Sequence, residues 1–347
     1  MVEAVAVLDV GKTHAKLSLI GRDGAILAVR SRANATPTAD GRQVLDAEGI
    51  EAWALATLGE LGREADLAAI VPVGHGAAAA LVEADRLAAP VMDYEAQPPH
   101  ELAQAYEAER DGFAVTGSPR LHRGLNLGMQ LYWQEQLYPD LWPRRARALL
   151  WPQYWAWRLC GEVAAEVSSL GCHSDLWRPR EHAYSALAKR RGWADRLGPM
   201  TPAGSRLGPA RRDLACGRVD VLCGVHDSNA SLHAVRSYPE VAGRPFTLVS
   251  TGTWFVAFRT GKAGWAEPER GGLTNVDVAG EPVQSARFMG GREYMAVVGE
   301  DLGVEPGPAE VRALVERGVS TQPSFDYGGG PYPRGPGAIS GSPATPA

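Results

Sequence analysis

A pattern of strand, glycine turn and strand occurs twice in this chain, and it constrains the fold more than any other feature. The first copy occupies 5–20, with a polar turn around Gly11. The second occupies 246–258, with a polar turn at Ser250–Thr253. Strand–glycine–strand segments are common, so chance similarity is one interpretation. The polar content of both turns favours the other interpretation, a partial internal duplication.

The remaining segments alternate between short apolar runs and helical patterns. A D-G dipeptide at Asp23-Gly24 separates two alternating runs and predicts a hairpin. Strands that come first and then alternate with helices are typical of an α/β fold with a mixed sheet. We expect strands at 5–9, 15–20, 25–30, 68–73, 90–93, 219–223, 246–249 and 254–258, and helices at 50–61, 77–87, 125–159 (with breaks at its prolines) and 228–235.

Composition excludes several classes of protein. A chain of 347 residues predicts about two domains. Its 40 acidic and 35 basic residues give a net charge of −5, which argues against a broad basic face for nucleic acid. No run of about 18 apolar residues occurs, and 1–9 lacks the features of a signal peptide. The four cysteines form no C-x-x-C pair and predict reduced thiols, so we expect a cytoplasmic protein that binds neither nucleic acid nor membranes: Cys160, Cys172, Cys216 and Cys223.

Both glycine turns have a composition that suits phosphate. Small residues let backbone N–H groups approach phosphate oxygens, and lysine or threonine side chains add donors. Asp9 ends the first strand, where it could hold Mg²⁺ through water. The competing interpretations are a turn-capping carboxylate for Asp9 and ordinary hairpin chemistry for Thr251-Gly252-Thr253.

A third candidate is Asp227, which follows the predicted strand 219–223 and begins a predicted helix. His226 precedes it. A carboxylate at a helix start can be an N-cap. It can also point into a cleft and accept a proton from an attacking hydroxyl, as phosphoryl transfer requires.

Together these segments resemble the motifs of the FGGY family of carbohydrate kinases, members of the actin-like ATPase superfamily. Five motifs occur in the family's order. They are Asp9–Lys16 (D-x-G-T-x-x-x-K), Val73–Gly76 (Q-M-H-G), Pro152–Glu162 (a helix ending in L-T-G-E), Gly224–Ala230 (G-x-x-D-x-x-A) and Ser250–Thr253 (S-x-G-T).

The resemblance implies a ribonuclease H-like (actin-like ATPase) α/β domain, with a mixed sheet flanked by helices and followed by a partial second copy. It implies ATP-dependent phosphorylation of a ketose or polyol, for example of the fuculose, rhamnulose or xylulose type, with Asp227 as general base. Asp9 and Asp227 would lie near Mg²⁺. ATP phosphates would contact Asp9, Gly11, Lys12, Thr13, Lys16, Thr251, Gly252 and Thr253, and the sugar would contact His75, Gly76, Asp93 and His226.

The chain departs from the family pattern at two places. Lys12 stands where threonine is usual, and no glycine-rich adenosine-binding segment or closing helix follows the second hairpin. We therefore expect a sugar-binding and catalytic-base domain at 1–240 and an incomplete ATP-binding domain at 241–347. A homodimer is compatible with this organisation, although no sequence feature specifies one.

Two other functions remain open at this stage. One is a sugar-binding relative that has lost ATP binding. The other is an NAD-binding oxidoreductase, because Gly74–Ala79 fits a loose G-x-G-x-x-A fingerprint and Asp93 stands where a ribose-binding acid would be. Pro72 in the preceding strand argues against that interpretation. The absence of G-x-S-x-G argues against a serine hydrolase.

Overall fold

The computed structural model describes residues 2–144, 146–211, 219–252, 254–261, 272–299, 305–322, 324–325 and 336–341. The chain divides into two compact units. The first comprises Met1–Arg244 and Leu273–Val283, and the second comprises Pro245–Gly272 and Gln284–Ala347. The predicted functional division at residue 240 stays a prediction.

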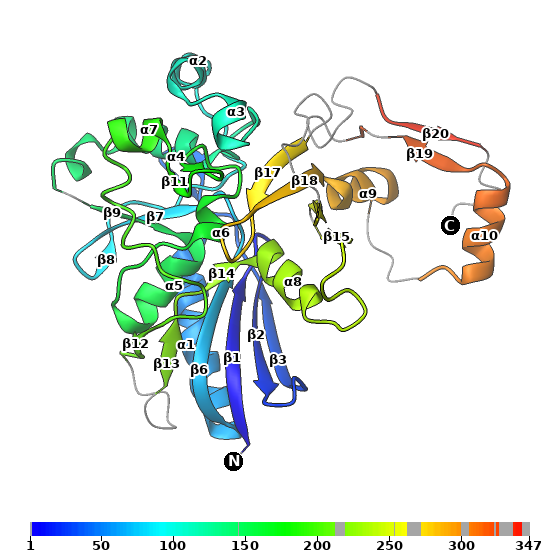
Figure 1. The fold of residues 1–347 in the computed structure, drawn as a ribbon, viewed down its shortest axis with the longest axis horizontal. Coiled ribbons are helices and arrows are strands. Elements are labelled where there is room, and N and C mark those ends of the chain that lie inside the picture. The colour runs from blue at the N-terminus through cyan, green and yellow to red at the C-terminus, as the bar shows by residue number, and fades with distance from the viewer. Residues whose placement is uncertain are drawn as a thin grey trace. The chain divides into compact units, whose positions relative to one another are not determined.

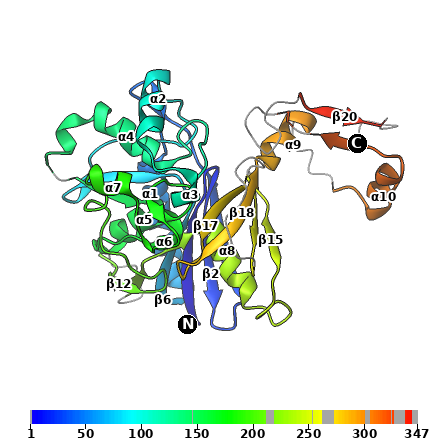
Figure 2. The same cartoon turned by 45° about the horizontal axis from the view of Figure 1, so that its top comes forward.

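The first unit is built on a seven-stranded mixed sheet. Its strands are β1 (Glu3–Val10), β2 (His14–Gly21), β3 (Ile26–Ala33), β6 (Asp66–Gly74), β12 (Arg206–Pro209), β13 (Asp220–Leu222) and β14 (Val225–His226). The order is β12-β13-β6-β1-β2-β3, and β14 also pairs with β6. The opening strands pair antiparallel, whereas β6 is parallel to β1, β13 and β14. Figures 1 and 2 show β6, β1 and β2 side by side.

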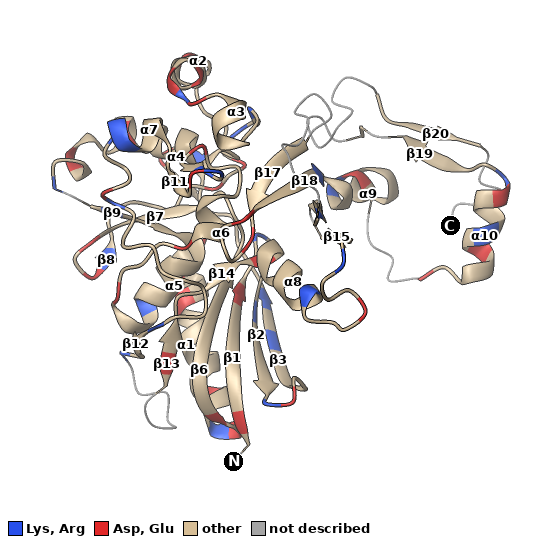
Figure 3. Ribbon diagram, viewed as in Figure 1, with Lys and Arg blue, Asp and Glu red and all other residues tan. Residues whose placement is uncertain are grey.

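Alternation along the strands decides which face of this sheet is covered. Every second residue of β1 is buried, from Ala4 to Val10. Helix α1 (Ala47–Glu64) contributes Leu58 to the same apolar cluster, and α5 (Trp151–Cys160) contributes Trp155. Charged residues are sparse along β1 and β6 in Figure 3. Burial of this apolar face stabilises the sheet and fixes its register.

A second apolar cluster lies among shorter elements of the first unit. The helices are α2 (His100–Glu109), α3 (Phe113–Thr116), α4 (Leu127–Leu137), η1 (Pro139–Leu141), α6 (Val167–Leu170) and α7 (Ala186–Arg190). Small sheets are formed by β4 (Thr38–Ala39) with β5 (Arg42–Gln43), by β10 (Trp177–Arg178) with β11 (Ala183–Tyr184), and by β8 (Arg86–Leu87), β7 (Ala79–Glu83) and β9 (Arg147–Leu150).

Three predicted elements differ from the structure in this region. The segment 77–87 is not a helix, because its residues 79–82 lie buried in β7 and pair with β9. The segment 90–93 contains an isolated bridge at Met92 in place of a strand. The dinucleotide interpretation also fails, since no helix follows Gly74–Ala79 to present its N-terminus to a pyrophosphate. The predicted helical region 125–159 is likewise interrupted by the strand β9.

Other predicted elements agree with the structure. The three opening strands, α1, β6, β13 and helix α8 (Asp227–Arg236) all lie where the sequence pattern places them. Pro72 is tolerated within β6 because it lies where the neighbouring strand changes from β13 to β14. Gly224 makes that change with φ +87°, and a Cβ there would come within 2.6 Å of the Pro72 carbonyl oxygen.

The second unit contains the second predicted hairpin. Strands β15 (Thr247–Ser250) and β16 (Phe255–Arg259) pair antiparallel, with Ser250 opposite Val256. Strand β18 (Pro282–Phe288) pairs with β16, and its first two residues belong to the first unit together with most of β17 (Gly272–Val276). Helices α9 (Gly290–Val298) and α10 (Pro308–Glu316) and strands β19 (Ser320–Gln322) and β20 (Ala338–Ser340) follow. None of the described helices has the length and apolar character needed to cross a bilayer.

Candidate active site

Three strand ends of the first unit meet at one edge of the sheet. In the parallel register, Asp9 of β1 lies opposite Val73 of β6, and His226 of β14 lies opposite Gly74. The backbone N–H of His75 donates to the Val10 carbonyl over 3.3 Å. Parallel strands therefore gather residues that are far apart in the sequence, as expected for a ligand site at carboxyl strand ends.

Asp9 lies in an unfavourable electrostatic environment. Burial and the nearby negative charge of Asp227 raise the pKa of Asp9 from 3.8 to about 6, while Lys16 acts in the opposite direction. Lys16 stands opposite Asp9 in the β1–β2 register. Two carboxylates close enough to repel form a place where a cation stabilises both.

The first glycine turn is held from outside its own motif. The Gly11 N–H donates to the His14 carbonyl over 3.0 Å. The side-chain amide of Asn34 donates to the Gly11 carbonyl over 2.9 Å, and its backbone N–H donates to the Thr13 carbonyl over 2.8 Å. Thr13 is exposed at the tip. Asn34 thus fixes the predicted phosphate turn, and no sequence motif marks it.

Lys12 does not extend freely from this turn. Its Nζ forms an ion pair with Asp93, whose side chain is fully buried, and it lies 5.4 Å from the centre of the Tyr94 ring. The sequence predicted Lys12 for phosphate and Asp93 for sugar. The structure brings the two together, and their separate ligand roles stay predictions.

His75 presents a buried acceptor. Its Nδ1 lies 2.8 Å from the Gly76 carbonyl, which can only accept, so Nδ1 carries the proton. Its Nε2 is buried and has no hydrogen-bond partner among the described residues. Burial lowers the pKa of His75 to about 4, so the ring is neutral at pH 7. The unpartnered Nε2 is therefore suited to accept a hydrogen bond from a hydroxyl.

His226 and Asp227 are linked through a fixed imidazole tautomer. The Asn229 side-chain amide lies 3.0 Å from His226 Nδ1 and donates to it, which leaves the proton on Nε2. Nε2 then faces Asp227 Oδ1 at 3.3 Å and Cys172 Sγ at 3.5 Å. Burial lowers the pKa of His226, so the ring is a neutral donor.

Asp227 is the first residue of α8 and not its N-cap, which is His226. Its Oδ1 accepts hydrogen bonds from the Ser228 N–H over 2.5 Å and from the Ser228 hydroxyl over 3.1 Å. Its side chain is 37% exposed. Among the described residues every hydrogen bond and ion pair of this carboxylate falls on Oδ1, which leaves Oδ2 for a ligand.

The imidazole of His226 fits tightly against the β6 end. A Cβ on Gly76 would lie 3.0 Å from His226 Nε2 and 3.1 Å from Cys172 Sγ. The hydroxyl of Ser168 accepts from the His226 N–H over 3.3 Å. Gly76 therefore serves packing against His226. The supporting residues Asn229, Cys172 and Ser168 were not predicted, and only the i, i+3 spacing of Asn229 from His226 offered a signal.

The second glycine turn lies in the other unit. Thr251 and Gly252 are exposed between β15 and β16, and Thr253 lies outside the described residues. Their predicted contacts with ATP stay predictions. In the described part of the chain no three His, Cys, Asp or Glu side chains form a group that could hold a metal alone. Mg²⁺ commonly takes one or two carboxylates and completes its shell with phosphate and water.

Comparisons with known proteins show which family and which solved structures this chain is similar to. Residues 243–347 match the family described as carbohydrate kinase FGGY, C-terminal domain. A crystal structure of a carbohydrate kinase from Novosphingobium aromaticivorans is similar to the chain, with 41% identity and a TM-score of 0.87. The match covers 99% of this chain and 77% of that one. A search of curated protein sequences found no significant match.

More distant structures share the fold alone. A ligand-bound xylulose kinase from Lactobacillus acidophilus is 15% identical, with a TM-score of 0.77 over 98% of this chain and 73% of its own. A Plasmodium falciparum glycerol kinase with ADP is 11% identical, with a TM-score of 0.77 over 99% and 73%. These neighbours confirm the predicted α/β fold of the actin-like ATPase type.

Proposed function

Because the chain belongs to the FGGY family of carbohydrate kinases, we propose that it transfers the γ-phosphoryl group of ATP to a hydroxyl of a ketose or polyol, with Asp227 as general base. The observation that carries the base assignment is the asymmetry of this carboxylate. Oδ1 is held by Ser228 and His226, and Oδ2 has no partner among the described residues. The held oxygen orients the group, and the open oxygen accepts the proton.

The base acts on the acceptor hydroxyl. The proton of this hydroxyl passes to Oδ2 of Asp227 as the hydroxyl oxygen forms a bond to the γ-phosphorus of ATP. The bond between that phosphorus and the β-phosphate oxygen breaks. Phosphoryl transfer of this kind depends mainly on positioning and charge stabilisation. The neutral His226 donor keeps the Asp227 carboxylate oriented. Burial lowers the pKa of His226, which prevents this ring from competing as a base.

The acidic pair fits a magnesium ion. Burial and the negative charge of Asp227 raise the pKa of Asp9, which means that its charged form lacks a compensating positive charge. Asp9, with Asp227 close by, would hold the ion through oxygen ligands, as Mg²⁺ prefers. When bound, Mg²⁺ supplies charge neutralisation at the phosphates. Thr13 and the backbone of Gly11, positioned by Asn34, would contact the phosphates themselves.

The sugar would lie between His75 and Asp227. A ketose or polyol offers hydroxyl donors, and the orphaned Nε2 of His75 needs one. Because Gly76 has no side chain, the imidazole of His226 can lie at the same edge of the sheet. Lys12 and Asp93 form an ion pair with each other, and in the proposed complex both side chains would reorient to bind sugar hydroxyls. The xylulose and glycerol kinases among the structural neighbours make ketoses and polyols the first substrates to test.

The test is a substrate panel with mass detection of the sugar phosphate. The wild-type chain is incubated with Mg-ATP and with fuculose, rhamnulose, xylulose, glycerol and related polyols. Asp66→Asn is the matched control, because Asp66 is exposed at the opposite end of β6. We expect product from the wild type and the control and none from Asp227→Asn. Sugar binding without product in the wild type would favour a relative that has lost its chemistry.

A further inference from the structure

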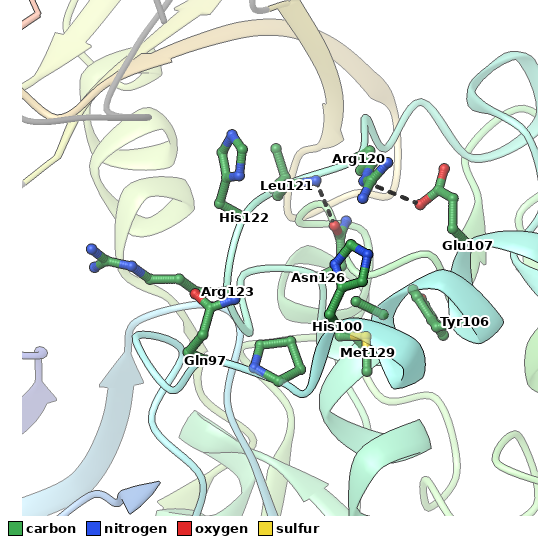
Figure 4. Close-up of a pocket in the computed structure, with 12 residues that line it drawn as sticks. Gln97, His100, Tyr106, Glu107, Arg120, Leu121, His122, Arg123, Asn126 and Met129 are labelled. Atoms are coloured by element: carbon green, nitrogen blue, oxygen red, sulfur yellow. Dashed lines mark hydrogen bonds and ion pairs between the residues drawn. The ribbon is translucent and has the colours of Figure 1, made fainter.

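A separate cavity lies beside the first turn of α2 in the first unit. Its volume is about 420 Å³, within the range of small-molecule sites. Figure 4 shows it between α2 and the segment 120–126, with Gln97 and His100 on one side and Leu121 and His122 on the other. None of the predicted phosphate or sugar residues lines it.

Basic residues outnumber acidic ones around this cavity. Arg120 and Arg123 carry permanent positive charge, and His100 and His122 add ring nitrogens. Glu107 is the one acidic residue in the lining. A net positive lining is unusual in a chain whose total charge is −5. The N-terminus of α2 adds partial positive charge here, and its N-cap Pro99 makes no side-chain capping bond.

Ion pairs with acidic residues of the chain do not fully neutralise this positive charge. Arg120 Nε lies 3.8 Å from Glu107 Oε2, at the outer limit of an ion pair, and its side chain is 65% exposed. Arg110 shares Glu107, with its Nη1 3.5 Å from Oε1. Arg123 forms no ion pair or side-chain hydrogen bond within the described ranges. Glu107 is thus shared between Arg110 and Arg120, and Arg123 has no acidic partner among the described residues.

The wall that carries the arginines is preorganised. The side chain of Asn126, which is almost fully buried, accepts from the Leu121 N–H over 2.9 Å. It also donates to the carbonyls of Pro119 over 3.1 Å and His173 over 3.0 Å. The Gly124 N–H donates to the Tyr94 carbonyl over 2.9 Å. The backbone that carries the arginines is therefore held in place before any ligand arrives, which lowers the entropy cost of binding.

We propose that this cavity binds a sugar-sized molecule that carries a phosphate or carboxylate group. Guanidinium groups recognise both oxyanions through charge-assisted hydrogen bonds, and the volume exceeds what an inorganic ion fills. The site is distinct from the one assigned to phosphoryl transfer, and its occupancy does not depend on ATP.

Isothermal titration of the full chain without nucleotide tests the proposal. The probes are glucose 6-phosphate, gluconate and neutral glucose. We expect one or both acids to bind more tightly than glucose, and Arg120→Gln and Arg123→Gln each to weaken that binding by about tenfold. Arg22→Gln, at an arginine that is 80% exposed in the β2–β3 turn, is the matched control and leaves binding unchanged.

Glu107→Gln provides a gain-of-binding arm. It removes the one negative charge of the lining and releases Arg120, so we expect at least threefold tighter acid binding. Whichever acid binds identifies the preferred oxyanion. Equal binding of glucose and the acids, binding that survives both arginine substitutions, or no binding of any probe to Glu107→Gln would overturn the proposal. Because no turnover is measured, these outcomes are independent of the kinase assay.

Discussion

The roles proposed for Asp227 and His226 fall on different atoms. Asn229 sets the tautomer of His226, and the proton on Nε2 then faces Asp227 Oδ1. In the proposed mechanism, Oδ2 accepts the proton of the substrate hydroxyl. This arrangement makes His226 a positioning residue, and its contribution is separable from that of the base.

Replacement of His226 by leucine removes the donor to Asp227. We expect kcat to fall by about 10- to 100-fold with little change in the KM for ATP, because the base loses its orientation. His226→Gln retains an N–H donor and should recover most of kcat. Steady-state kinetics over pH 5.5–8.5 checks this expectation. Equal losses in the two variants would show that His226 serves packing alone.

Asp9 affects stability in the direction set by its raised pKa. The folded pKa is about 6 and the ordinary value is 3.8, so folding with the charged form carries a cost. That cost is complete above about pH 6 and vanishes below about pH 4. Asp9→Asn should therefore raise the free energy of unfolding at pH 7.5 by ~1–3 kcal/mol, allowing for solvent screening, in metal-free buffer.

Urea unfolding of wild type and Asp9→Asn at pH 4 and pH 7.5 makes that comparison. The difference between the two proteins should be large at pH 7.5 and close to zero at pH 4. Mg²⁺ with a nucleotide should stabilise the wild type more than the variant. A difference that does not change with pH would mean that the electrostatic environment of Asp9 is misassigned.

The turn after β6 shows how an element positions the site. Gly76 allows His226 to pack where a Cβ would lie 3.0 Å from its Nε2. Gly76→Ala should lower the free energy of unfolding by ~1–3 kcal/mol, because overpacking displaces His226 or Cys172. It should also reduce kcat. Thermal and urea unfolding, together with turnover, measure both effects.

Gly59 supplies the control for this substitution. It lies within α1, and a Cβ there would meet nothing within 4 Å. Gly59→Ala should therefore stabilise the protein by ~0.5–1 kcal/mol through helix propensity. A loss of stability in Gly59→Ala, or none in Gly76→Ala, would contradict the packing argument.

Local patterns predicted the regular elements and failed where tertiary pairing overrides propensity. Alternation placed β1 and β2 within one or two residues of their ends. The alanines of 77–82 favour a helix in isolation, yet β7 is buried and paired on both sides, with β8 and β9. No local pattern carries that pairing, since β9 lies more than 60 residues away along the chain.

Over the whole chain, the order of the motifs predicted which strand ends lie together better than it predicted the contacts between side chains, and the ligand roles of these residues stay predictions. The strand ends that carry Asp9, His75 and Asp227 do meet, because β1, β6 and β14 are parallel. The supporting atoms were not predictable. Asn34 lies outside every motif, and the Lys12–Asp93 pair joins residues assigned to different ligands. Such contacts depend on three-dimensional packing and leave no periodic signal.

The most direct measurement compares Asp227→Asn with wild type in two assays on the same preparation. One follows formation of sugar phosphate with the substrate found in the panel, and the other follows binding of Mg-ATP by titration. The proposed mechanism predicts that turnover falls by at least about 100-fold while nucleotide affinity changes little. Near wild-type turnover in Asp227→Asn would contradict the assignment of Asp227 as the base.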